Sequence, residues 1–327
     1  MSVPADVARY PFPLPHPTYR ISANVEPACV VRETEAGSWG ATVLDDGPDR
    51  GALAAARAAV LDAEPARFVA APHARAACWD ACLHLAGLLA AAQPGTCSLT
   101  RDDDGVRRFR DTVTGTDLRL VPGDEDALPE HPLRWISRHL AEDVVVLGAR
   151  DGALWLDAGA VASASVWSVG FDAGMSFREL HGPVPGNGPG GVFERAERFL
   201  LRLDPGEAYR RLNWGLQPGD HHDLSLDAAP AWQPARARLA AGAPVTDPGR
   251  EIHLRTEVQH MVRLPRTGAV LFLIGIRLLP LERVALVPAW AERLASVCET
   301  LPPEVAEYKE LEPLASITAR WLRARRP

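Results

Sequence analysis

The clearest pattern of apolar and polar positions runs from residue 251 to residue 281. Over its first half the positions alternate with a period of two, as side chains do along a β-strand. One side is mostly apolar and carries Ile252, Leu254, Thr256, Val258, His260 and Val262. The other side is mostly polar and carries His253, Arg255, Glu257, Gln259, Met261 and Arg263. The pattern predicts one strand with two chemically different faces.

A turn and a second apolar run follow this strand. Residues 264–268 read Leu-Pro-Arg-Thr-Gly, in which proline presets φ and glycine permits a positive φ. Residues 269–279 are apolar at nearly every position, which is typical of a strand covered on both faces. We therefore expect an antiparallel hairpin inside a covered sheet. The polar side of the first strand forms a row of polar side chains, which we call the polar row. An unpaired buried polar group costs about 1–3 kcal/mol. The polar row therefore lies either at a solvent-exposed edge of the sheet or along a cavity that holds a polar ligand.

The rest of the chain predicts a mixture of helices and short strands. Helical patterns cover about 51–93, with breaks at Pro65 and Pro72, and also 133–140, 192–203 and 288–322. Alternating pieces span 97–121, with turns at 104–105 and 114–115, and a second hairpin joins 144–147 to 153–158. The composition of residues 210–214 favours a helix end packed by Trp214. These elements predict an α+β fold with an antiparallel sheet.

We expect one compact unit in three parts. Residues 1–95 form an irregular and helical N-terminal extension that packs on the core. Residues 96–285 form the core, and residues 286–327 form a C-terminal helical extension.

Composition narrows the class of protein. The chain has 327 residues and a net charge of −7, which argues against a wide nucleic-acid footprint. No segment approaches the roughly 20 apolar residues of a membrane helix, and no secretory signal is visible at the N-terminus. The cysteine count is five, an odd number, which indicates a reduced, cytoplasmic setting.

Several common sites are not predicted by the spacing of residues. Cys78 and Cys82 share one helix face, but two thiolates do not complete a zinc or iron–sulfur site. The Gly-rich run 186–191 reads as a loop, because no strand enters a helix around it. His221 and His222 are adjacent and point in different directions, so they are poor candidates for ligands of one metal.

Two segments are chemically rich. His181 precedes the stiff run Gly-Pro-Val-Pro, so its imidazole is pre-oriented for either a structural role or a metal or haem ligand. Arg211 lies near an amide and an indole at Asn213 and Trp214, and a guanidinium can hold a carboxylate in a forked geometry.

Three ordered motifs resemble the haem-dependent oxidative N-demethylase family. They are AEDVVVLGARDGALWLDAGAVASASVW followed by LHGPVP, then Arg211-x-Asn213-Trp214, then RTEVQHMVRLPRTGAVLFLIGIRLLPLE. In the third motif the matching residues are Arg255, Glu257, Gln259, Arg263, Leu264, Pro265, Thr267, Gly268, Leu271, Phe272 and Ile274. The resemblance covers about residues 130–285.

The resemblance implies a PAS-like fold, in which a five-stranded antiparallel sheet carries flanking helices. It also implies non-covalent haem b as cofactor, O2 as co-substrate, and removal of an N-methyl group from a small amine with release of formaldehyde. Electrons would come from NAD(P)H through a separate flavin reductase, because the chain shows no flavin or NAD motif. No nucleic acid or membrane partner is expected, and a homo-oligomer stays open.

The mechanism that we expect gives roles to individual residues. The resemblance does not itself name the iron ligand, and we choose His181 because it is the one histidine inside a family motif. Arg211 or Arg263 is expected to pair with the haem propionates, with Trp214 and Arg255 also at the cofactor. Glu257 and Gln259 are expected to hold the substrate ammonium or the oxygen, as the catalytic pair.

Departures from the family pattern suggest an altered substrate. Ala164-Ser165-Val166-Trp167 lacks the family's proline, Leu273 and Gly275 replace a polar threonine and an arginine, and residues 260–262 replace Thr-Leu-Arg. We expect these positions in or beside the pocket, where they favour a larger or less polar amine, as in specialised metabolism.

Two other functions stay open at this point. PAS folds are commonly sensors, and fold alone does not fix function. The chain is therefore an enzyme, a haem-binding or small-molecule-binding PAS module that acts as a sensor or accessory subunit, or a degenerate member without haem that serves as an assembly partner.

Overall fold

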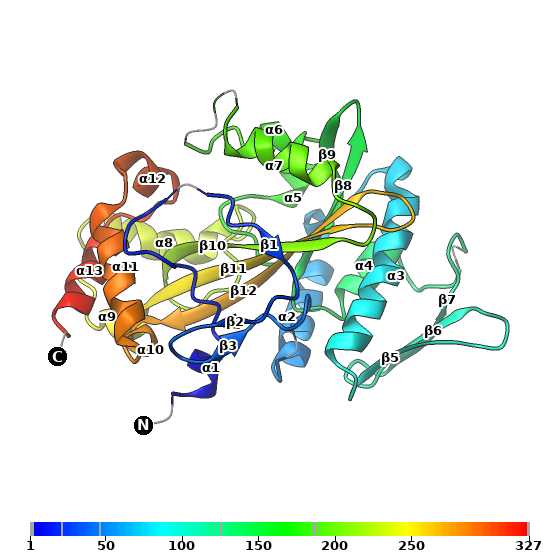
Figure 1. The fold of residues 1–327 in the computed structure, drawn as a ribbon, viewed down its shortest axis with the longest axis horizontal. Helices are drawn as coiled ribbons and strands as arrows, with labels where there is room; N and C mark the ends of the chain where they lie inside the picture. The colour runs from blue at the N-terminus through cyan, green and yellow to red at the C-terminus, as the bar shows by residue number, and fades with distance from the viewer. Residues whose placement is uncertain are drawn as a thin grey trace.

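The computed structural model describes residues 3–20, 22–45, 47–124, 126–185, 188 and 190–325. The predicted loop at 186–191 lies partly outside the described residues. The molecule combines antiparallel sheet and helices, and its centre is one large sheet (Figure 1).

Within the described residues this sheet has seven strands in the order β1-β10-β11-β12-β8-β9-β4. All neighbouring pairs are antiparallel. Five strands are long: β8 (Asp143–Arg150), β9 (Ala153–Ala160), β10 (Ala208–Pro218), β11 (Ile252–Arg263) and β12 (Val270–Pro280). Two short strands close the edges, β1 (Glu26–Pro27) and β4 (Phe68–Ala70). The large sheet is therefore wider than the expected five strands.

The two predicted hairpins of the large sheet are confirmed. Strands β11 and β12 pair from His253–Pro280 to Arg263–Val270. Strands β8 and β9 meet at a turn in which Asp151 (φ 54°) and Gly152 (φ 74°) are both left-handed. Two-residue turns of this kind match the twist of the strands that they join.

The prediction for residues 210–214 was wrong. These residues lie in β10 and not at a helix end, and β10 pairs with β11 along its whole length. The alternation of β10 is obscured because Arg210 occupies an inward position. Its guanidinium is 0% exposed and donates to Glu26 Oε1 at 2.7 Å and to the carbonyl oxygens of Ala28, Val30 and Gly40.

The two faces of the large sheet are covered by different layers. We call the face that carries Arg211, Asn213, Glu257 and Gln259 the site face, and the face that carries Val258 and His260 the rear face. Helices α5 (Val169–Asp172), α6 (Phe177–Leu180) and α7 (Val192–Leu201) cover the site face over β8 and β9. Figure 1 shows α6 and α7 above the sheet, beside β9.

The rear face is covered by two apolar clusters. One cluster joins α3 (Arg75–Ala92) and α4 (Pro132–Ser137) to the strand side chains at β8, β11 and β12. The other joins the N-terminal segment, α11 (Pro288–Thr300) and α13 (Leu314–Arg323) to the other end of the sheet. In Figure 1 these two groups lie at opposite ends of the molecule.

The remaining elements are short or peripheral. The N-terminal part holds α1 (Ala5–Ala8), β2 (Arg32–Glu33), β3 (Ser38–Trp39), α2 (Arg50–Ala63), η1 (Pro65–Arg67) and η2 (Pro72–Ala74). A small sheet contains β5 (Cys97–Arg101), β6 (Arg107–Asp111) and β7 (Thr116–Leu120), as the turn residues predict. The connections and C-terminal part hold α8 (Ala229–Ala240), α9 (Pro248–Glu251), α10 (Leu281–Val284) and α12 (Pro303–Tyr308).

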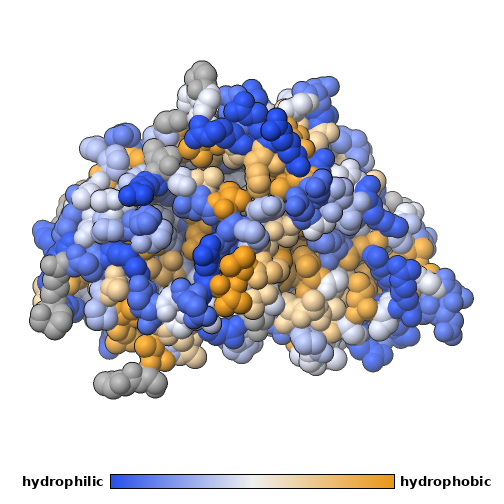
Figure 2. All heavy atoms as spheres, in the orientation of Figure 1, coloured by the Kyte–Doolittle hydropathy of each residue, from blue (hydrophilic) through white to orange (hydrophobic). Residues whose placement is uncertain are grey.

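Among the described residues, no helix is both long and apolar enough to cross a bilayer. Figure 2 shows strongly hydrophilic residues over α6 and α7 and along the projecting small sheet. Part of the charge on α7 lines an open groove of about 440 Å³, formed by Arg195, Arg198, Phe199 and Arg202.

Candidate functional site

The polar row of β11 is buried. Arg255, Glu257 and Gln259 are 3%, 7% and 7% exposed, although β11 carries polar side chains on this face. The row is therefore not a wet edge, and its side chains must find partners inside the protein. Most of these partners come from β10, whose Arg211 and Asn213 lie opposite Gln259 and Glu257.

Glu257 is at the centre of this network. Its Oε2 accepts hydrogen bonds from Asn213 Nδ2 at 3.1 Å and from Gln259 Nε2 at 2.8 Å. Gln259 Oε1 in turn accepts from Arg211 Nη1 at 2.8 Å. A second guanidinium, that of Arg255, places its Nε 3.6 Å from Glu257 Oε1. The predicted catalytic pair thus lies together between the buried cation of Arg255 and the half-buried cation of Arg211.

Arg211 joins the row to the N-terminal extension. Its Nε donates to the carbonyl oxygen of Ala23 at 3.0 Å. Burial lowers the pKa of this guanidinium, while the charge of Glu257 raises it. Arginine keeps its proton throughout the accessible pH range, so Arg211 is a fixed cation at the site face.

His181 follows α6 directly, and the helix is well defined at its start. Ser176 caps α6 by a reciprocal pair of hydrogen bonds with Glu179. His181 Nδ1 lies 2.7 Å from the carbonyl oxygen of Phe177, so Nδ1 carries the proton and Nε2 holds the lone pair. The expected turn is present, because the amide of Val184 donates to the carbonyl oxygen of His181 at 3.1 Å.

Two phenyl rings hold the imidazole of His181. The ring centroids of Phe177 and Phe193 lie 4.2 and 4.4 Å from that of His181. Burial lowers the pKa of His181 to about 4, the Phe177 carbonyl raises it, and the charge of Arg211 lowers it. The imidazole is therefore neutral at physiological pH, which is the form that binds a metal.

Three other residues expected at the cofactor lie in different surroundings. Arg255 donates to the carbonyl oxygens of Ser163 at 2.7 Å and His222 at 2.9 Å, so it ties two loops to β11. Trp214 packs in the apolar cluster of the rear face. Arg263 lies at the far end of β11, four residues or about 13 Å beyond Gln259 along the strand, and its buried Nη1 has no partner among the described residues.

Lys309 was missed by the sequence reasoning. It follows α12, and its Nζ donates to Asn213 Oδ1 at 2.9 Å and to the carbonyl oxygen of Trp214 at 2.8 Å. No local motif marks it. One global feature could have drawn attention to it, since it is the single lysine of the whole chain.

Most of the departures from the family pattern do not lie beside the polar row. His260, Val262, Leu273 and Gly275 belong to the rear face, because they alternate with Gln259 and Ile274 along their strands. Among these positions, Met261 alone points to the site face, where it joins the apolar cluster under α7. Four of these five positions therefore lie on the opposite face of the sheet from Glu257 and Gln259.

The two cysteines of α3 behave as small core residues. Cys78 and Cys82 are both fully buried in α3, and burial raises the pKa of the Cys78 thiol to about 12. Across the described ranges, no group of three or more His, Cys, Asp or Glu side chains is arranged to hold a metal ion.

A protein-family model described as haem-dependent oxidative N-demethylase, alpha subunit-like, matches residues 52–318. The chain belongs to this family. The match extends well beyond the three motifs and includes α2, the β10–β12 region and Lys309.

The donor set around His181 fits the haem that this N-demethylase family depends on. A neutral imidazole whose other nitrogen is fixed by a carbonyl is a usual form of haem ligand. The flanking phenyl rings offer apolar surface, and the half-buried guanidinium of Arg211 offers a partner for a carboxylate.

Proposed function

We propose that this N-demethylase relative binds haem b and uses O2 to remove an N-methyl group from a small amine, with formaldehyde as co-product. The observation that carries the proposal is the hydrogen-bonded row of half-buried Arg211 and buried Gln259 and Glu257, close enough to a neutral His181 for the charge of Arg211 to lower the pKa of its imidazole. A bound haem would supply the oxidation chemistry, and the protein would supply position and polarity.

His181 would bind the iron through Nε2, and Arg211 or Arg263 would pair with the propionates. The hydrogen bond to the Phe177 carbonyl supports this role, because it fixes the tautomer and the ring orientation. Arg255 and Trp214 would act less directly, Arg255 by holding the Ser163 and His222 loops and Trp214 from behind the sheet.

Glu257 and Gln259 would bind the amine. Two amide donors already occupy Glu257 Oε2, so a substrate N–H would meet Oε1, which it would share with the guanidinium of Arg255. The substrate ammonium would lose its proton to this carboxylate before the methyl group is oxidised, and Gln259 would hold the carboxylate in place. Burial of the row excludes water, which strengthens each of these contacts.

The fold and the family description support two further parts of the proposal, a PAS-like core and a separate partner protein. The five long strands with α5, α6 and α7 inserted between β9 and β10 are compatible with a PAS-like core. The words "alpha subunit" in the family description support a separate partner, which we take to be the NAD(P)H-dependent flavin reductase. The same words favour one second candidate, an accessory subunit whose haem serves another chain.

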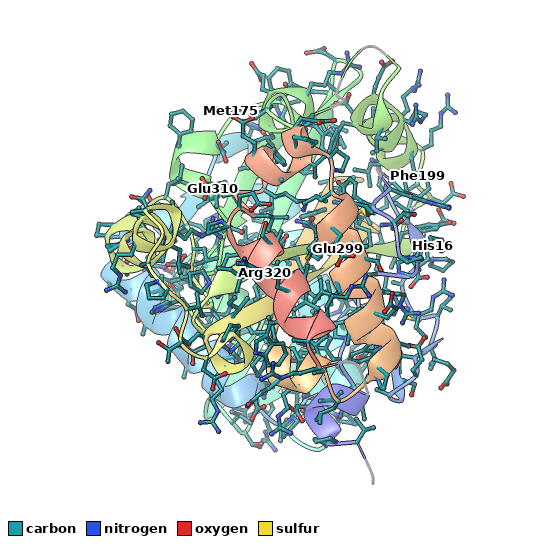
Figure 3. All side chains as sticks on the ribbon, turned by 90° about the vertical axis from the view of Figure 1, so that its left-hand side faces the viewer. His16, Met175, Phe199, Glu299, Glu310 and Arg320 are labelled. Carbon is teal, nitrogen blue, oxygen red and sulfur yellow. The ribbon has the colours of Figure 1, made fainter. Side chains whose placement is uncertain are left out.

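An absorption spectrum of the purified protein tests haem binding. We expect a Soret band that His181→Ala removes or shifts and that His16→Ala, a change at an exposed histidine (Figure 3), leaves in place. An unchanged band in the His181 variant would eliminate the ligand assignment. Oxygen consumption with methylated amines and a flavin reductase then separates an enzyme from a sensor or accessory subunit, which would bind haem without turnover.

A further inference from the structure

Lys309 is unusual in both composition and position. The chain has 35 Lys and Arg residues, and 34 of them are arginines. The one lysine lies just after α12, in the C-terminal extension, and reaches the edge of β10. Its Nζ also lies 5.7 Å from the centre of the Trp214 ring. The single ε-amine of the protein is therefore placed in the polar network of the site face.

The contact between Lys309 and Asn213 fixes the direction of an amide. An ammonium group only donates hydrogen bonds, so Lys309 Nζ requires the amide oxygen of Asn213, 2.9 Å away. The NH2 group of the same amide must then face Glu257, and Nδ2 donates to Oε2 at 3.1 Å. If the amide turned over, its oxygen would face a carboxylate and the hydrogen bond would be lost.

We propose that Lys309 is a positioning residue of the candidate site, which acts through the amide of Asn213 to fix the carboxylate of Glu257 for its ligand. Asn213 and Gln259 together occupy Oε2, so the carboxylate is held with Oε1 on the side of Arg255, where it would meet the substrate amine. The inference rests on the proposed function for the identity of that ligand. The C-terminal extension is in consequence part of the site.

The charge of Lys309 makes this contact dependent on pH. Burial lowers the pKa of Lys309 to about 8, the charge of Glu257 raises it, and the charge of Arg211 lowers it. Tyr308 and Tyr19 are the other titratable groups here, and burial raises the pKa of both. Above about pH 8 the neutral amine can also accept a hydrogen bond, so it no longer dictates the direction of the Asn213 amide. An arginine would not lose its proton in this range.

A labelling experiment tests the coupling without haem or turnover. Amine-selective acylation modifies Lys309 and the N-terminus alone, so mass spectrometry of one peptide gives the rate at Lys309 as a function of pH. We expect a midpoint near 8, and a lower midpoint in Glu257→Gln because the charge that raises this pKa is removed. A midpoint near 10.5, or no change in Glu257→Gln, would overturn the proposal.

The matched control removes a different contact of the same segment. Arg236 on α8 pairs with Glu310, the residue after Lys309, on the outside of the molecule; Figure 3 shows Glu310 on the side facing α8. Arg236→Met should leave the Lys309 midpoint unchanged. A shift equal to that of Glu257→Gln would show that loosening of α12 explains the result, and would count against the proposal.

Steady-state kinetics provide a second test of the proposal for Lys309. At pH 7 we expect Lys309→Met and Asn213→Leu each to lower kcat/KM about tenfold, the size expected for one hydrogen bond to a charged group. The double variant should be no worse than either single variant, because both changes break the same path. Wild-type activity should decline above pH 8, and this decline should be absent in Lys309→Met. Additive losses in the double variant, or the same pH profile in wild type and Lys309→Met, would contradict the proposal for Lys309. A wild-type protein without haem or turnover would instead refute the proposed function. In that case the labelling experiment alone would decide the role of Lys309.

Discussion

Asn213 on β10 and Glu257 on β11 lie directly opposite each other, and the amide of Asn213 donates to Glu257 Oε2 at 3.1 Å. The pair connects two groups that are far apart in sequence. Lys309 approaches from the C-terminal side, and Arg211 approaches through Gln259. One carboxylate therefore lies among three cations, of which Arg255 is buried and Arg211 and Lys309 are half-buried.

Removing that carboxylate should destabilise the fold. Glu257→Gln leaves the buried guanidinium of Arg255 without its carboxylate partner, and breaking a buried charge pair typically costs about 3 kcal/mol. We expect a loss of this order in urea unfolding. Glu304→Gln, at an exposed position of α12, is the control and should change the free energy of unfolding by less than about 0.5 kcal/mol. Equal effects of the two changes would argue that the network is solvated.

A second buried carboxylate predicts sensitivity to acid. Asp111 is 0% exposed; burial alone would raise its pKa, but hydrogen bonds from His139 and Arg50 outweigh burial and hold the pKa well below 3.8. A lowered pKa means that the stabilisation is present above 3.8 and is lost as pH falls below it. Unfolding measured from pH 6 to pH 2 should show a steeper loss in wild type than in Asp111→Asn. Parallel curves would remove Asp111 as a cause.

Lys309 predicts that stability also rises with pH in the alkaline range. Its pKa falls from 10.5 to about 8 in the folded protein, so between these values the unfolded chain binds more protons and folding becomes more favourable as pH rises. Comparing wild type with Lys309→Met removes the contribution of other groups. The stability of wild type relative to the variant should increase from pH 8 to pH 10.5, as measured by urea unfolding. A constant difference would indicate an exposed amine.

Two glycines test which face of the sheet matters. A Cβ at Gly275 would lie at least 3.5 Å from its neighbours, so Gly275→Ala should be tolerated and could stabilise the strand by about 0.5 kcal/mol. Because Gly275 is on the rear face, the variant should also keep any haem spectrum of the wild type. Gly148→Ala is the contrasting change, since its Cβ would meet the carboxylate of Asp157, a buried group. A spectrum altered by Gly275→Ala would place the pocket on the rear face.

The sequence predicts the β11–β12 hairpin well because both signals there are local. Alternation over twelve residues and a Pro-Gly turn need no knowledge of distant contacts. Strand β10 could not be predicted in this way. Its inward Arg210 is stabilised by Glu26 and by carbonyl groups of the N-terminal extension, which are more than 160 residues away in the chain.

The candidate site was predictable to the same extent. Glu257 and Gln259 follow from the period of one strand, and His181 from its motif. The assignment of Trp214 to the cofactor neglected that adjacent strand residues face opposite sides, so Asn213 and Trp214 cannot share one face. The place of Lys309 in the site could not be predicted from the sequence, because only the packing of the folded chain brings residue 309 to β10.

The alternation of β11 fixes which side chains of residues 252–263 face each side of the sheet. Both sides of this strand are covered, so inserting or deleting a single residue would exchange Glu257 with Val258 and send carboxylate and guanidinium groups into hydrocarbon. Changes of length in this protein are therefore confined to its connecting loops, and a redesigned pocket must keep β11 at its present length.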